Sequence, residues 1–133
     1  MIDLKTENLL INKEVNENLE SILKRKAFSN GYIFYGPEGI GKKQTAMKFI
    51  MEIFNKYSSN SNIEKKIIDN NQPDFLLIEP TYFVKGNLIN RSEAEPRKNN
   101  QGTIRIEQIR NLKTFLGQKS IESGEKIVLI DDA

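Results

Sequence analysis

The chain has 133 residues, enough for one domain, and its 38% hydrophobic and 29% charged residues are typical of a soluble globular protein. A net charge of +2 is too small to indicate nucleic-acid binding by itself. The absence of Cys and His excludes disulfides, thiolate or imidazole metal sites and a histidine general base.

The sequence also gives no sign of a membrane segment. No apolar run approaches the roughly 20 residues of a membrane span, and the N-terminal stretch MIDLKTENLLINKE lacks the basic-then-apolar order of a signal peptide. We therefore expect a cytoplasmic protein that does not bind a membrane. Any metal ion would have to be a hard cation held by carboxylates, water or phosphate.

Two amphipathic helices are predicted in the first half of the chain. One begins at the expected N-cap Asn12 and is ended by the Ser-Asn-Gly run at 29–31, and the other extends from Lys42 to about Tyr57. The apolar positions at helical spacing are Val15, Leu19, Ile22 and Leu23 in the first helix, and Ala46, Ile50, Ile53 and Phe54 in the second.

Short apolar runs predict three strands buried on both faces of a parallel sheet. They are YIFY at 32–35, DFLLIEP at 74–80 and KIVLIDDA at 126–133. Alternation of these strands with helices predicts an α/β fold, with a parallel sheet and flanking helices.

The remaining segments are assigned by periodicity and polarity. A short helix is predicted at 63–69 and a longer one at 104–118, where Gly117 is the expected C-cap. The residues at 81–102 are polar and aperiodic, which predicts a long loop, and the mixed charges of 91–98 favour disorder there.

The stretch GPEGIGKK at 36–43 fits the phosphate-loop pattern G-x-x-x-x-G-K and departs from it only at the last position. Its glycines allow turns that a Cβ would block, so the loop amides can converge on phosphate oxygens. The helix start adds its dipole, and Lys42 adds a charge toward the β- and γ-phosphates. The predicted nucleotide-binding residues are Gly36, Pro37, Glu38, Gly39, Ile40, Gly41, Lys42 and Lys43.

Lys43 stands where the pattern requires Ser or Thr. An ammonium group only donates hydrogen bonds and cannot coordinate Mg²⁺, and Thr45 lies about 200° further around the helix. We therefore predict that the loop binds ATP weakly or without metal. The alternative, that Lys43 is a solvated helix residue beside an idle loop, stays open.

The apolar run at 126–133 ends in Asp131 and Asp132. In P-loop ATPases the first carboxylate at such a strand end holds the magnesium shell, and the second, usually Glu, activates water as a general base. Asp131 is therefore a candidate Mg²⁺ ligand, and Asp132, one methylene shorter than Glu, is a candidate base. The alternative is two solvated carboxylates.

Four stretches resemble, in this order, the AAA+ modules of bacterial clamp-loader subunits of DNA polymerase III, and delta-prime subunits most of all. The resemblance runs from about residue 8 to the end, with 81–102 as a longer insert. It implies an ATPase-like module in a five-subunit ring, with delta and tau or gamma subunits as partners, that places the sliding clamp on primed DNA. The stretches are NKEVNENLESILKRKAFSNGYIFYGPEGIGKK, QPDFLLIEP, IRIEQIRNLKTFL and GEKIVLIDDA.

The sequence departs from this family in two respects. Members usually carry a four-cysteine zinc module before the PDF strand, but 55–74 has no Cys, so no zinc is predicted and this stretch is expected to be mobile. The family strand order 5-1-4-3-2 implies that residue 133 ends strand 3. We therefore expect 1–133 to be an incomplete N-terminal module without lid and collar domains.

The hypothesis that follows is a clamp-loader subunit of the polymerase III holoenzyme, which helps ATP-driven clamp loading and has no polymerase activity of its own. Delta-prime subunits often lack ATPase activity, in agreement with Lys43 and Asp132. The alternative is an active AAA+ ATPase, such as a helicase loader. A P-loop kinase for small molecules would need an acceptor pocket and an arginine-rich lid, which nothing in the sequence indicates.

Overall fold

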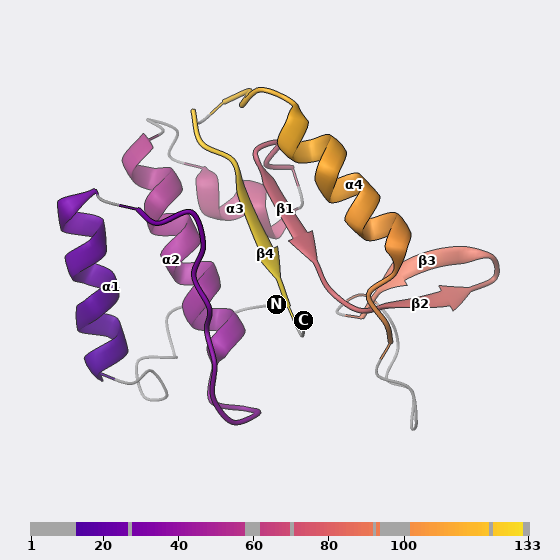
Figure 1. Ribbon diagram of the computed structural model, residues 1–133, viewed down its shortest axis with the longest axis horizontal. Coiled ribbons are helices and arrows are strands. Elements are labelled where there is room, and N and C mark those ends of the chain that lie inside the picture. The colour runs from indigo at the N-terminus through magenta and orange to yellow at the C-terminus, as the bar shows by residue number, and fades with distance from the viewer. Residues whose placement is uncertain are drawn as a thin grey trace. The chain divides into compact units, whose positions relative to one another are not determined.

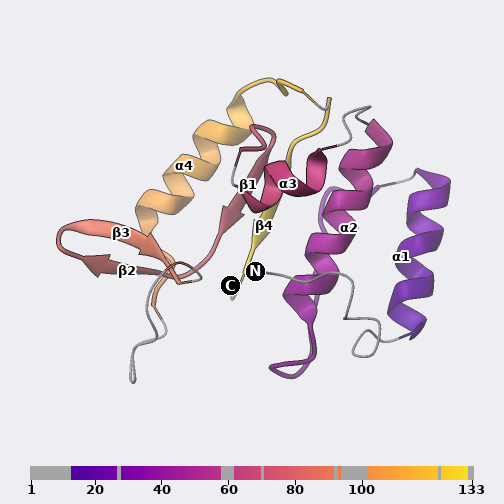
Figure 2. The ribbon, with the colours of Figure 1, turned by 180° about the vertical axis from the view of Figure 1, so that it is seen from behind.

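The chain divides into two compact units, residues 1–72 and residues 73–133. The structure, a computed structural model, describes residues 13–26, 28–57, 62–69, 71–91, 93, 102–122 and 124–131 (Figure 1). In the described ranges the first unit contains helices, and the second contains strands and helix α4, as the view from behind also shows (Figure 2).

The first unit contains the three helices predicted for it. They are α1 (Lys13–Arg25), α2 (Lys42–Tyr57) and α3 (Ile63–Ile68). The predicted bounds of α2 are confirmed at both ends. Asn12 lies outside the described residues, so its role as N-cap of α1 stays a prediction.

Helix α2 carries most of the core of the first unit, and α1 and α3 both contact it. Its four predicted apolar positions are all buried, and Phe54 is 0% exposed. The side chain of Lys56 donates to the Leu23 carbonyl at the end of α1, at 2.9 Å. Two aromatic rings, Phe28 and Tyr32, meet Phe49 edge to face. These two residues of the connection between α1 and α2 are thereby packed against α2.

The strand predicted at 32–35 does not form. Ile33 and Tyr35 are 89% and 90% exposed, although their residue types favour a buried strand. A strand needs a neighbour for its amide and carbonyl groups, and no strand in the described part of the chain pairs with this segment. The prediction of a buried strand at 32–35 was therefore wrong.

The second unit is built on two parallel strands, β1 (Phe75–Ile78) and β4 (Ile127–Ile130). They pair in the register Phe75↔Ile127 to Ile78↔Ile130, and α4 (Ile106–Gly117) contacts β1. This confirms the α/β fold with a parallel sheet and the strands predicted at 74–80 and 126–133. Gln118, and not Gly117, is the C-cap of α4.

A hairpin occupies the first part of the segment that was predicted to be a loop. Strands β2 (Thr81–Val84) and β3 (Asn87–Asn90) pair antiparallel. Lys85 and Gly86 join them, with φ of 50° and 82°, as the two-residue turn of a tight hairpin requires. The loop prediction at 81–102 was therefore wrong for 81–90, while 92 and 94–101 lie outside the described residues. The missed signal was Gly86 between two short apolar pairs.

Asp74 fixes the turn that leads into β4. Its side chain is fully buried and accepts hydrogen bonds from the amides of Ile121 and Glu122, both at 2.8 Å, and from the Ser120 hydroxyl at 3.1 Å. The Asp74 carbonyl also accepts the amide of Ile127 at 2.9 Å. One residue before β1 therefore sets where β4 begins.

Gln108 joins the start of α4 to the end of β1. Its side-chain oxygen accepts the Arg105 amide at 2.8 Å, which satisfies a donor at the helix start. Its side-chain nitrogen donates to the Glu79 carbonyl, also at 2.8 Å. The IRIEQIR block thus begins a helix and fixes that helix to the sheet.

Candidate functional site: the glycine loop and the acidic strand end

The glycine loop leads directly into α2. Gly39 and Gly41 have φ of 78° and 91°, the left-handed region in which other residues are strained. The Lys42 ammonium donates to the Gly36 carbonyl at 2.7 Å and so spans the loop. The Gly41 carbonyl accepts both the amide and the hydroxyl of Thr45, at 3.0 and 2.8 Å. These contacts fix both ends of the loop to the first turn of the helix.

The middle of the loop presents its backbone to solvent. Residues 36–40 are exposed, and Glu38 and Gly39 form the middle of a hydrogen-bonded turn, which leaves the amides of Glu38, Gly39 and Gly41 without a described backbone acceptor. Such amides, with the N-terminus of a 16-residue helix directly behind them, favour an anion. This part of the site fits a phosphate group.

The first turn of α2 does not fit a magnesium ion. Lys43, its second residue, is a cation where an oxygen ligand would be needed. The hydroxyl of Thr45 donates to the Gly41 carbonyl, and Thr45 is only 8% exposed. Neither side chain supplies a ligand to a metal ion at the loop.

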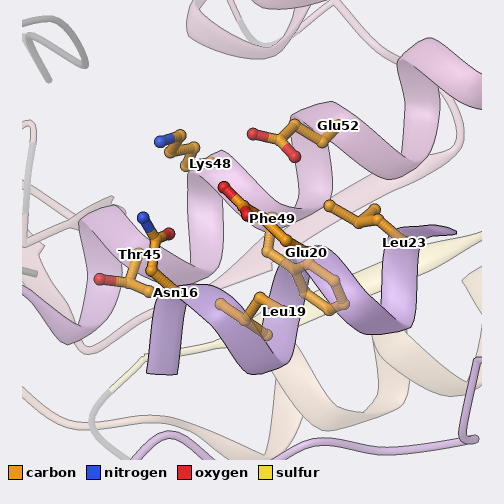
Figure 3. A pocket seen from close by; sticks show the side chains of 8 residues that line it. All are labelled: Asn16, Leu19, Glu20, Leu23, Thr45, Lys48, Phe49 and Glu52. Carbon is orange, nitrogen blue, oxygen red and sulfur yellow. The ribbon is translucent and has the colours of Figure 1, made fainter. Parts of the chain in front are cut away.

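A pocket between α1 and α2 is too small for a nucleotide. Figure 3 shows its side chains, which come from both helices. Its volume of about 20 Å³ has room for about one water molecule. Thr45 is part of its wall, so this residue is turned toward α1. The lining residues are Asn16, Leu19, Glu20, Leu23, Thr45, Lys48, Phe49 and Glu52.

Asp131, the candidate metal ligand, forms an ion pair. It follows β4 directly, and its amide donates to the Ile78 carbonyl at 2.8 Å. The Arg91 side-chain nitrogen Nη2 lies 3.4 Å from its Oδ2, and the two side chains are 30% and 21% exposed. Sequence reasoning did not find Arg91, because no local pattern joins a residue of the predicted loop to a strand end.

The remaining site predictions are not tested by the structure. Asp132 lies outside the described residues, so its role as a base stays a prediction. The glycine loop and Asp131 belong to different units, so a joint site also stays a prediction. Within the described ranges, no three Asp or Glu side chains gather as a metal site.

None of the described helices has the length and apolar character that a membrane crossing requires.

The comparisons with known proteins identify the family. No curated protein and no solved structure matches the chain. The model of the family described as "DNA polymerase III, delta subunit" matches residues 11–133, a range that includes the glycine loop and β4. The chain therefore belongs to the clamp-loader family of DNA polymerase III, which acts in DNA replication.

Proposed function

We propose that this chain is a delta-prime-type subunit of the bacterial clamp loader and acts in the cytoplasm. It would join delta and tau or gamma subunits in a ring of five that places the sliding clamp on primed DNA. Membership of the clamp-loader family supports this proposal. The observation that carries the delta-prime assignment is Lys43, which replaces the Mg²⁺-binding hydroxyl of an active phosphate loop.

In this proposal the glycine loop binds ATP through its phosphates and without a metal ion. The exposed residues 36–40 of the loop and the positive end of α2 support phosphate binding. Lys42 would supply one point charge, and Lys43 a second one. Because a hydrolytic site needs a metal to neutralise the transferred phosphoryl group, we infer that partner subunits hydrolyse the ATP that drives loading.

Assembly tests the first part of the proposal. The full-length gene product, produced together with the delta and tau or gamma subunits of the same organism, should elute with them as one stable complex. Omitting each partner in turn should show which subunits contact this one. If the gene product elutes alone in every combination, it is not a clamp-loader subunit.

Nucleotide titration tests the second part. A fluorescent ATP analogue should bind with an affinity that Mg²⁺ changes by less than about threefold, since no ligand for the metal is supplied at Lys43. The isolated subunit should show no ATP turnover above that of a blank. Tight, Mg²⁺-dependent binding with turnover would favour the active ATPase instead.

A further inference from the structure

We propose that Arg91 occupies, as a fixed cation, the position beside Asp131 where P-loop ATPases hold a divalent metal ion. The β2–β3 hairpin would then close this strand end to Mg²⁺ independently of the change at Lys43. This inference rests on the proposed function and concerns the same site, and all residues that carry it belong to the second unit.

The backbone places both partners of the ion pair. The carbonyl of Ile78 accepts the Asp131 amide at 2.8 Å, and the carbonyl of Pro80 accepts the Arg91 amide, also at 2.8 Å. Both residues are thus anchored to the short stretch from Ile78, the last residue of β1, to Pro80. Their side chains leave the backbone from neighbouring, fixed positions, so ordering them costs less entropy than pairing two mobile surface side chains.

The hairpin restricts Arg91 from the other side. Arg91 directly follows β3, and the register Thr81↔Asn90 fixes the residue before it. Thr81 also pairs with Thr103 through two backbone hydrogen bonds, at 3.0 and 3.2 Å. The hairpin is therefore held at its base on both edges of β2, which fixes the backbone position of Arg91.

The charges of the pair oppose a metal ion. The guanidinium lies 3.4 Å from a carboxylate oxygen, and both side chains are largely withdrawn from solvent, which weakens screening by salt. A divalent cation on the same carboxylate would lie within a few ångströms of the guanidinium and be repelled by it. Asp131 would first have to leave Arg91, so the Arg91–Asp131 pair, the described part of this strand end, does not fit Mg²⁺.

Binding of Mn²⁺, a paramagnetic substitute for Mg²⁺, tests this proposal on the whole chain. Free Mn²⁺ is measured by electron paramagnetic resonance during titration with MnCl₂ alone. Arg91→Gln should bind Mn²⁺ at least about fivefold more tightly than the unmodified protein, because one like charge is removed. The gain should disappear in the double variant Arg91→Gln with Asp131→Asn.

Two control variants separate charge from general effects. Arg110→Gln, at an exposed position of α4, makes the same change of net charge, and Arg91→Lys keeps the charge beside Asp131. Neither should raise Mn²⁺ affinity by more than about twofold. A gain in Arg91→Gln no larger than in Arg110→Gln overturns the proposal.

The single variant Asp131→Asn keeps the test decisive if Arg91→Gln does not fold. With Arg91 kept, this variant should bind Mn²⁺ as tightly as the unmodified protein. A fall in Mn²⁺ affinity of more than about threefold overturns the proposal, because it would mean that Asp131 binds metal in the unmodified protein. Complex formation with delta and tau or gamma is measured on the same proteins. Its failure would remove the proposed function, whereas the Mn²⁺ result concerns Arg91 alone.

Discussion

The glycine loop and the acidic strand end differ in what positions them. The loop is one continuous stretch, 36–43, and its geometry follows from glycines in the left-handed region. The strand end brings together Arg91 and Asp131, which are 40 residues apart, through the carbonyls of Pro80 and of Ile78, the last residue of β1. A change inside a continuous motif, such as Lys43, is therefore visible in the sequence, while the pairing of Asp131 with Arg91 is visible only in the structure.

Two glycines show the same difference between a local requirement and one that depends on distant residues. Gly39 and Gly102 both have φ of 78°. No described atom lies within 4 Å of a Cβ built on Gly39, whereas one built on Gly102 would lie 3.1 Å from both the Pro80 Cβ and the Thr81 carbonyl oxygen. Backbone conformation alone thus requires glycine at position 39. At position 102 glycine is required both by conformation and by close packing against Pro80 and Thr81.

The largest expected effect is that of Gly102→Ala. Left-handed strain and a close contact with backbone should together lower the free energy of unfolding by about 3 kcal/mol. Urea unfolding measures this value. Gly124→Ala is the control in the same unit, because Gly124 has the same φ and open space around it. It should cost about 1 kcal/mol, and equal losses in the two variants would contradict the packing argument.

Asp74→Asn should have the next largest effect. The amide cannot accept all three hydrogen bonds that the carboxylate accepts, so at least one buried donor is left unsatisfied, at a cost of about 2 kcal/mol. Hydrogen exchange should become faster at the amides of Ile121 and Glu122. Asp69→Asn, at an exposed position, should change stability by less than about 0.5 kcal/mol. Unchanged exchange at both amides would show that Asp74 does not hold this turn.

Lys42→Met tests the glycine loop and should leave stability nearly unchanged. Loss of one charge at the phosphates should weaken binding of a fluorescent ATP analogue about tenfold, which corresponds to about 1.4 kcal/mol. The exposed Lys24→Met makes the same change of charge in the same unit and should alter affinity by less than about twofold. Equal affinities for Lys42→Met and the unmodified protein would mean that the loop is idle.

The smallest effect expected is a gain. Gly117 ends α4 without a left-handed φ, and a Cβ there would meet no described atom within 4 Å. Gly117→Ala should therefore raise the free energy of unfolding by about 0.5–1 kcal/mol, through higher helix propensity. Thermal unfolding followed by circular dichroism measures it. A loss of stability would indicate that the position needs glycine after all.

The helices could be predicted because their signals are local. The apolar spacing in α2 gave its bounds and its buried face, including Phe54. The failure at 32–35 has a different cause, since strand formation depends on a partner and not on residue type alone. The hairpin was missed because most residues of 81–102 are polar, which favours a loop. The single sign of a hairpin turn in this segment was Gly86.

In the candidate site, too, the local motifs could be read from the sequence, and the contact between distant residues could not. The phosphate-loop interpretation came from eight consecutive residues, with the departure at Lys43, and it stays a prediction. Asp131 directly follows β4, as the sequence indicated. Arg91 was not found, since its pairing depends on a β-turn, a strand register and a hydrogen bond to Pro80 acting together. Such a contact has no pattern in the sequence around either partner.

Three successive carbonyls, those of Ile78, Glu79 and Pro80, accept hydrogen bonds from residues that are synthesised at very different times. Arg91 emerges soon after them, Gln108 later, and Asp131 last. At ordinary rates of synthesis the interval between Ile78 and Asp131 is about 3 to 10 seconds. Until β4 is synthesised, the backbone groups of β1 that pair with it have no partner strand. The nascent chain would therefore be most prone to aggregation or chaperone binding during those seconds.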